Sequence, residues 1–248
     1  MIFRQLFNPA DSAMTYLIGD PVSGEAVVID PLKYQATLIR ALLAEHHLRL
    51  KYVLRTHVHA PNRVDCGDLC PHTGAHFVIG RHNDPTLAGD RVADGDVLRF
   101  GDESIAVIET PGHTPGCVTY HWRDRIFCGD VLELGGCGQA VDETDAGLMY
   151  DSVRKRIYSL PGETLVYPAH DYSGRHVSSI AQEKTRNPRL GGGKTLEEFT
   201  AIMASLNLPY PKFIDHAVPG NKACGECPTN LPQELQKYCG QMAESPQG

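Results

Sequence analysis

The sequence predicts a layered α/β domain, and two observations support this. Short apolar runs rich in β-branched residues recur along the chain, and turn signals close many of them, as is typical of strands. Segments with apolar residues at helical spacing stand between these runs, and no repeat period is visible. Because both kinds of element recur over the whole length, helices packed on sheets are favoured. The 248 residues suffice for one such domain with a small appendage.

The first third of the chain predicts the order strand, strand, helix, strand. Turn signals close the two opening runs, which favours an antiparallel pair. The helix is indicated by apolar residues at Leu38, Ile39, Leu42 and Leu43. In chain order, these elements are expected at residues 15–18, 26–29, 35–46 and 50–54.

The remainder predicts six strands and two helices. The strands are expected at residues 75–79, 97–100, 104–108, 117–122, 125–128 and 164–168, and the helices at 146–160 and 196–206. The glycine-rich run 187–193 is interpreted as a flexible joint. We therefore expect a main domain over residues 1–190 and a C-terminal extension over 191–248 that packs on it, with a disordered tail.

Composition and charge exclude several classes of function. Apolar residues make up 42% and charged residues 21%, which is ordinary globular usage. A net charge of -7 without a Lys/Arg-rich block argues against nucleic acid or an anionic membrane as the main partner. The first residues lack the features of a secretory signal, and no apolar run reaches the ~18 residues of a membrane span. We expect a cytoplasmic protein whose eight cysteines are mostly thiols.

The main chemical motif is the pair His57 and His59, which follows the predicted strand 50–54. Two histidines at i and i+2 beyond a strand end can both turn toward one metal ion. Three later segments also place ligand-type residues beside glycine or proline after a strand; they are residues 109–116, 128–130 and 168–171. Strand-end loops on one edge of a sheet can bring distant residues together. Taken together, the motifs predict a metal centre.

The order of these motifs resembles that of the metallo-β-lactamase superfamily and, more closely, of the persulfide dioxygenases, also called sulfur dioxygenases. The similar stretches cover nearly the whole chain; they are residues 1–7, 113–118, 136–138, 167–172, 187–190 and 217–221. The resemblance implies a four-layer αββα metallo-β-lactamase sandwich with a short C-terminal helical extension. It also implies a homodimer.

The resemblance further implies one Fe(II) per chain, held by His57, His113 and Asp130. Two histidines and one carboxylate leave three positions on the iron for substrate and O2. His59 and His170 would then be catalytic groups that orient ligands or hydrogen-bond substrate, O2 or water. The candidate substrate contacts are Tyr172, Arg189, Cys137 and Lys222.

In this family the substrate is glutathione persulfide or a similar low-molecular-weight persulfide, which O2 oxidises to sulfite with release of the thiol. The chain departs from the family pattern at two places. Pro61 and Asn62 replace an acid and a histidine that would hold a second metal ion, which favours a one-metal enzyme. Gly135 and Gln139 stand where arginines usually flank residues 136–138, so the carrier thiol could be smaller or differently charged.

Two other functions remain open on the sequence alone. A thioester hydrolase of the glyoxalase II type shares the expected fold but would need two metals. The other alternative is a catalytically degenerate paralogue that binds thiols or metal without catalysis. It shares the expected fold too, since one fold serves many functions. Zinc also remains an alternative to iron, because a site of this composition accepts both.

Two cysteine motifs have weaker interpretations as sites. One is a zinc site formed by Cys66, Cys70, His72 and His76, since residues at i and i+4 share a helical face. The other is the pair Cys224 and Cys227, which has the spacing of a redox or zinc-knuckle motif but lacks the accompanying elements. We expect ordinary thiols at both.

Overall fold

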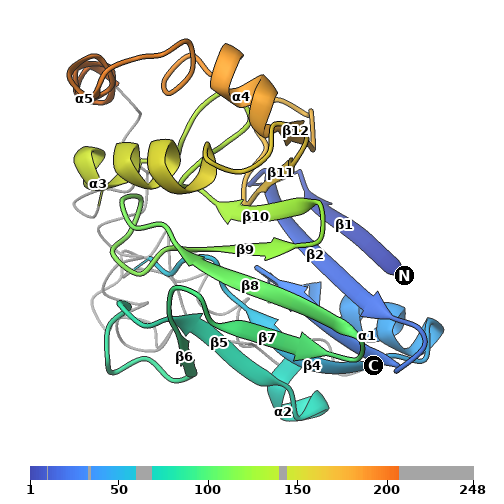
Figure 1. Ribbon diagram of the computed structural model, residues 1–248. Coiled ribbons are helices and arrows are strands. Elements are labelled where there is room, and N and C mark those ends of the chain that lie inside the picture. The colour runs from blue at the N-terminus through green and yellow to red at the C-terminus, as the bar shows by residue number, and fades with distance from the viewer. Residues whose placement is uncertain (10, 33–34, 60–68, 140–143, 207–248) are drawn as a thin grey trace, which may run out of the picture. The chain divides into compact units, whose positions relative to one another are not determined.

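The structure is a computed structural model that describes residues 1–9, 11–32, 35–59, 69–139 and 144–206. All of these except His59 belong to one compact unit, and the fold below is that of this unit. It contains two six-stranded sheets with helices on their outer faces (Figure 1). None of the described helices has the length and apolar character that crossing a bilayer requires.

The first sheet has its strands in chain order. They are β1 (Ile2–Asn8), β2 (Ala13–Asp20), β3 (Glu25–Ile29), β4 (Arg49–Leu54), β5 (His76–Gly80) and β6 (Asp90–Val92). The first three pair antiparallel, whereas β3 to β6 pair parallel. Parallel neighbours need a crossover connection, which α1 (Ala36–Glu45) supplies between β3 and β4. The short α2 (Leu69–Thr73) precedes β5.

The second sheet is ordered β12-β11-β10-β9-β8-β7. Its strands are β7 (Val97–Phe100), β8 (Glu103–Glu109), β9 (Val118–Trp122), β10 (Arg125–Gly129), β11 (Leu165–Pro168) and β12 (Ser178–Ser179). All neighbours are antiparallel except β10 and β11. Its helices are α3 (Ala146–Asp151), the π-helical η2 (Ser152–Ile157) that continues it, α4 (Ile180–Arg186) and α5 (Leu196–Ser205).

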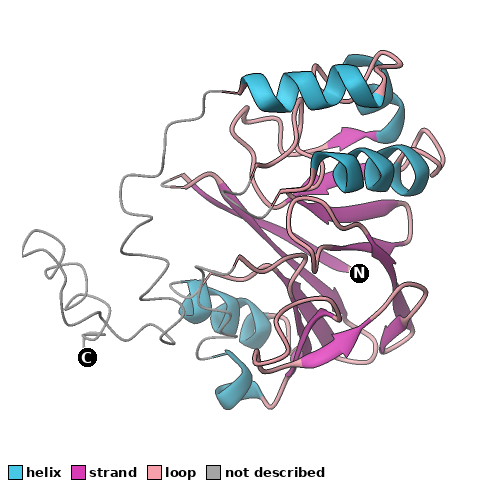
Figure 2. Ribbon diagram, turned by 90° about the vertical axis from the view of Figure 1, so that its left-hand side faces the viewer, coloured by secondary structure: helices cyan, strands magenta, loops and turns pink. Residues whose placement is uncertain are grey.

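Three apolar clusters separate four layers. The central cluster joins the sheets through aromatic residues such as Tyr16 and Phe127, whose ring centroids are 4.9 Å apart. A second cluster packs α1 on the first sheet, and a third packs α3, η2, α4 and α5 on the second sheet. Strand β2 is buried throughout because alternate residues face two different clusters: Tyr16 faces the second sheet and Leu17 faces α1. The αββα sandwich is therefore confirmed (Figure 2).

Most predicted elements form within one or two residues of their expected bounds. The predicted helix 146–160 changes to π-helical geometry at Ser152 and ends at Ile157. Five elements were not predicted, namely β1, β6, β12, α2 and α4. The boundary near residue 190 remains a prediction, and most of the extension lies outside the described residues; its helix α5 packs in the third cluster through Phe199 and Met203.

Candidate metal centre

The strand ends of both sheets carry the candidate ligands. His57 follows β4 of the first sheet, His113 lies between β8 and β9, and Asp130 directly follows β10. Strands β8 and β10 both run antiparallel to β9, so their C-terminal ends lie at the same edge of the second sheet. Strand β11 runs parallel to β10 and brings His170 to that edge as well.

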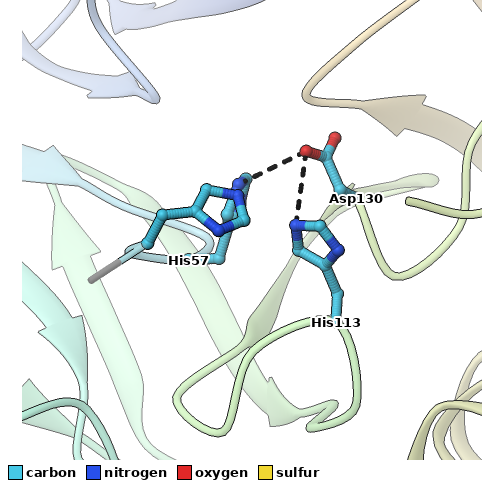
Figure 3. A group of neighbouring side chains, drawn as sticks. His57, His113 and Asp130 are labelled. Atoms are coloured by element: carbon cyan, nitrogen blue, oxygen red, sulfur yellow. Dashed lines mark ion pairs between the residues drawn. The ribbon is translucent and has the colours of Figure 1, made fainter. Parts of the chain in front are cut away.

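One carboxylate oxygen lies at the centre of this group. Asp130 Oδ2 is 3.3 Å from His57 Nε2 and 3.6 Å from His113 Nε2, and both rings point toward it (Figure 3). Together with His59, these residues offer ligand atoms that all lie within 4.8 Å of one another. Ligand atoms bound to one ion at about 2.1 Å stand roughly 3 Å apart, so the group could hold a metal ion. The fold thus brings together the residues from which the motifs predicted a metal centre.

His57 is oriented by residues that the sequence motifs did not indicate. The backbone N–H and the hydroxyl of Thr56 donate to the two Asp30 oxygens at 2.9 and 2.7 Å. The single hydroxyl proton of Thr56 is thereby used, so Thr56 Oγ1, 2.9 Å from His57 Nδ1, accepts the Nδ1 proton. The lone pair of His57 is then on Nε2, the nitrogen that faces Asp130 and that would bind a metal ion.

Asp30 directly follows β3 with a φ of 50°, and Thr15 Oγ1 donates to its carbonyl oxygen at 2.7 Å. From the sequence, Asp30 was interpreted only as part of the turn signal Asp30-Pro31 that ends the strand. The signal that could have found it is the one used for the other ligands, a carboxylate directly after a strand. The left-handed backbone aims that carboxylate at Thr56.

His170 binds the carboxylate from a third direction. Its Nδ1 lies 2.8 Å from Asp130 Oδ2 and 2.9 Å from Oδ1. Burial alone would lower the pKa of His170, but the Asp130 carboxylate outweighs it and raises the pKa to about 9. Burial would likewise raise the pKa of Asp130, whereas the positive charge of His170 and its hydrogen bond hold it well below its usual range. Asp130 is therefore an anion, as a ligand of a cation must be.

Two glycines let the backbone approach the ligands. Gly129 has a φ of 61°, and a Cβ there would lie 2.6 Å from Thr56 Oγ1. A Cβ on Gly138 would lie 2.7 Å from Asp130 Cβ and 2.9 Å from His113 Cε1. Both contacts are shorter than carbon and oxygen atoms tolerate, so these positions require glycine.

The loop of residues 133–138 contacts both this centre, through Gly138 and Asp130, and helix α5, through Cys137 and Met203. Cys137 is fully buried, and burial raises the pKa of its thiol to about 12, so it is a thiol and not a nucleophilic thiolate at neutral pH. Its Sγ lies 3.6 Å from Met203 Sδ, which favours a role in packing over the predicted contact with substrate. Arg189 Nη1 donates to the Cys137 carbonyl in a short hydrogen bond.

The remaining predicted site residues have different surroundings. Tyr172 is 71% exposed and its ring stacks on that of His170, with centroids 5.8 Å apart. Cys117 and Cys128 are buried in the core, as strand positions predict. His76 pairs with Asp90 at 2.9 Å on the surface. Other residues of interest lie outside the described part of the chain; these are Pro61, Asn62, Cys66, Lys222, Cys224 and Cys227.

Comparison with known proteins agrees with this geometry. Human mitochondrial persulfide dioxygenase ETHE1 is 43% identical over 231 residues, which cover 91% of this chain and 89% of the human protein. The chain belongs to the persulfide dioxygenase family. A hydroxyacylglutathione hydrolase of Cereibacter sphaeroides is more distant, with 34% identity over 71% of this chain and 69% of the hydrolase. A search of protein-family profiles finds no match.

Solved structures agree with this family assignment. The crystal structure of ETHE1 from Myxococcus xanthus has a TM-score of 0.83 and 46% identity, covering 91% of this chain and all of that chain. A metallo-β-lactamase from Staphylococcus aureus has a TM-score of 0.79 and 26% identity, covering 94% of this chain and 74% of its own. This persulfide dioxygenase family member therefore has the metallo-β-lactamase fold.

Proposed function

We propose that this protein oxidises a low-molecular-weight persulfide with O2. The reaction balances as RSSH + O2 + H2O giving RSH, sulfite and two protons. Membership of the persulfide dioxygenase family supports this reaction. The structural observation that carries it is the placement of His57 and His113 around one oxygen of Asp130, a set of two imidazoles and one carboxylate.

The metal ion is proposed to be Fe(II), one per chain, with His57, His113 and Asp130 as its ligands. The fit rests on the ionised, buried Asp130 and on the Nε2 lone pair that Thr56 leaves on His57. When bound there, Fe(II) would supply open coordination positions for substrate and O2 and the redox chemistry that the reaction needs. The protein's contribution is the number, charge and orientation of the ligands.

The surrounding side chains are proposed to fix the protonation state and the orientation of the metal-binding side chains. Thr56 and Asp30 keep His57 in one tautomer. His170 holds the Asp130 carboxylate in place and neutralises its charge when protonated. His59 lies among the ligand atoms and is proposed to contact substrate, O2 or water.

The assembly and location are further proposals. A homodimer is expected from the family resemblance, and light scattering after gel filtration tests it. A cytoplasmic location is likewise proposed.

Oxygen uptake tests the proposed reaction. Anaerobically purified protein loaded with Fe(II) is given glutathione persulfide, and O2 uptake, sulfite and metal content are measured on one sample. We expect sulfite production with one iron per chain. Asp130→Ala should lose iron and at least about 100-fold in activity, since removing one ligand removes a charged bond to the metal. Arg99→Gln, on the exposed face of β7, serves as the matched control.

A different result would favour another function. Hydrolysis of a glutathione thioester with two metal ions per chain and no O2 uptake would establish the hydrolase function instead. A filled iron site with neither activity would identify a degenerate thiol-binding or metal-binding protein.

A further inference from the structure

Two loops that contact Asp130 approach each other at a second point, where the guanidinium of Arg175 lies. The first is the 133–138 loop, in which backbone hydrogen bonds between Glu133 and Gly136 close a tight turn. At one end of this loop the backbone of Gly138 packs against Asp130, with its N–H donating to the Asp130 carbonyl at 2.7 Å. Toward the other end, Gly135 occupies the corner of the turn with a φ of 87°.

The second loop begins at His170, which hydrogen-bonds Asp130, and continues through Tyr172, which stacks on His170. Five residues after His170, the guanidinium of Arg175 lies over the corner of the first loop. Its Nη2 is 3.1 Å from the position that a Cβ on Gly135 would occupy. Because Gly135 has no side chain, the guanidinium has room at this position.

The chain path limits the distance from this cation to the ligands. Gly135 and Gly138 are three residues apart, so their Cα atoms are separated by at most about 11 Å. Gly138 is in direct contact with Asp130 and His113. In a peptide thiol, one residue and a side chain separate the sulfur from the nearest terminal carboxylate, which is on the order of 8 Å. The largest Cα separation of Gly135 and Gly138 and the length of such a thiol from sulfur to carboxylate are therefore comparable.

The charge of Arg175 is only weakly engaged by its neighbours. Its contacts are 3.5 Å to Glu183 Oε1 and 3.3 Å to Ser173 Oγ, both long for charge-assisted hydrogen bonds. The buried Glu183 carboxylate already accepts closer bonds, from Ser178 Oγ at 2.6 Å and Asn187 Nδ2 at 2.9 Å. The Arg175 side chain remains 39% exposed.

Arg189 is the other arginine that contacts the 133–138 loop, and its hydrogen bonds differ from those of Arg175. Its Nη1 donates to the Cys137 carbonyl, so part of its fork is used to hold the loop itself. Of these two guanidinium groups, Arg175 is therefore the one that is exposed and weakly bonded.

We propose that Arg175 is a specificity-determining residue that receives a carboxylate of the substrate. The inference rests on the proposed function and assigns the residue that would hold the carboxylate end of a peptide persulfide. A planar guanidinium binds a carboxylate through two parallel hydrogen bonds, which fixes orientation as well as charge. The carboxylate at Arg175 would place the sulfur end of the molecule toward Asp130 and the histidines.

Calorimetric binding tests this assignment without turnover. The probes are S-methylglutathione, which has two carboxylates, and its diethyl ester, which has none. We expect the protein to bind the acid more tightly than the ester. Arg175→Gln should weaken binding of the acid about tenfold, which corresponds to about 1.4 kcal/mol, and leave the ester unchanged. Arg175→Lys should retain part of the affinity, and Arg99→Gln, at the opposite edge strand of the sheet, should bind both as the wild type does.

Oxygen-uptake kinetics give a second readout. With glutathione persulfide, Arg175→Gln should raise KM about tenfold with little change in kcat; with the persulfide of the diethyl ester, both constants should stay at their wild-type values. A merely structural role beside Glu183 would instead lower activity with both substrates and lower the melting temperature. That result, or equal binding of acid and ester by the wild type, would overturn the proposal.

The outcomes also separate this proposal from the proposed function. O2 uptake by the wild type without discrimination between acid and ester would leave the dioxygenase function standing and refute the role of Arg175. Arg175-dependent binding of the acid, with no O2 uptake from either persulfide, would support the anion site and refute the dioxygenase function.

Discussion

At the scale of single residues, proton positions decide what the centre can bind. The Thr56 hydroxyl has one proton and gives it to Asp30, which compels His57 to donate from Nδ1. A metal ion needs a deprotonated nitrogen, so this pair selects the tautomer that binds at Nε2. Two residues outside the proposed ligand set therefore decide which nitrogen of His57 would bind the metal.

Replacing Thr56 by valine removes this selection while keeping the shape of the side chain. Thr56→Val should lower metal affinity 10- to 100-fold, which is typical for loss of a group that orients a ligand. Thr56→Ser retains the hydroxyl and should bind nearly as the wild type. Competition with a chelator of known affinity measures both, and equal affinities for the two variants would contradict the prediction.

Glu133 should give the metal-free protein a distinctive pH dependence. Burial, reinforced by the charge of Asp130, raises the pKa of Glu133 to about 8 from an ordinary value of 4.5. The folded state then binds a proton that the unfolded chain has released, so stability falls as pH rises from about 4.5 to 8 and levels off above.

Glu133→Gln should remove that slope and raise the free energy of unfolding at pH 8 by at least the ~1.4 kcal/mol of one pKa unit. Urea unfolding of both proteins in chelator, from about pH 5 to about pH 9, measures the difference. Parallel curves for the two proteins would show that Glu133 is ionised in the folded state.

The sequence allowed prediction of some of these residues and not others. His57, His113 and Asp130 stand in motifs after strands, where few other roles explain them. Asp30 and Thr56 are residue types that occur in any turn, and their role depends on the hydrogen bonds that the fold creates. Cys137 was a candidate substrate contact because its burial, which raises its pKa, is a property of the folded chain that the sequence does not show.

At the scale of elements, the loop carrying His113 is fixed by the helix that packs on it. A Cβ on Gly112 would lie 2.3 Å from the backbone of Met149 in α3, so the loop and the helix are in direct contact. Ser152, the first residue of η2, donates to the Pro111 carbonyl at 2.6 Å. The helix changes to π geometry where it makes this contact, as is common near functional sites.

Gly129 ends β10 and allows a test of close approach between strand ends. Gly129→Ala adds a Cβ 2.6 Å from Thr56 Oγ1 and strains a residue with positive φ. Gly74→Ala, at a φ of 69° with no atom within 4 Å, adds only the backbone strain of about 1–2 kcal/mol. We expect Gly129→Ala to lose at least about 2 kcal/mol more and to weaken metal binding, as thermal unfolding and metal titration would show. Equal losses in the two variants would mean that the Thr56 contact is unimportant.

The elements that the sequence did not predict are short or lie at edges. Strands β6 and β12 have three and two residues, too few for a visible alternation. Helix α2 has five residues, including Pro71, and is too short to be stable without its neighbours. Strand β1 is an edge strand with the polar residues Arg4 and Gln5 in its middle, and its pairing with β2 decides its structure.

At the scale of the molecule, the helices on the second sheet share one apolar cluster. Phe199 of α5 is fully buried there, although α5 follows the glycine-rich run after residue 190. The layered α/β class was predictable because most of its elements are long enough to show their periodicity, whereas the αββα order was implied by the family resemblance. The domain boundary near residue 190 stays a prediction, because a glycine-rich run does not by itself show where one packing unit ends.

Phe199→Ala should therefore destabilise the whole domain by about 3–5 kcal/mol, the usual result of emptying a buried aromatic position. Leu196→Ala, in the same helix but 44% exposed, should change stability by less than about 0.5 kcal/mol. Denaturant unfolding measures both. Loss of α5 alone, seen as an early separate transition, would indicate that the extension unfolds independently.

The two sheets are also joined directly by backbone hydrogen bonds at the edge that carries the ligands. Val118 N donates to Thr56 O at 2.8 Å, and Met14 N donates to Ala169 O at 2.8 Å. Sheets that meet only through side chains can slide over one another, but these bonds join their backbones beside His57 and His170. We expect the amide hydrogens of Val118 and Met14 to exchange with deuterium only when the whole domain unfolds. Thermal motion of the sandwich would then be concentrated away from this edge, leaving the spacing of the ligands undisturbed.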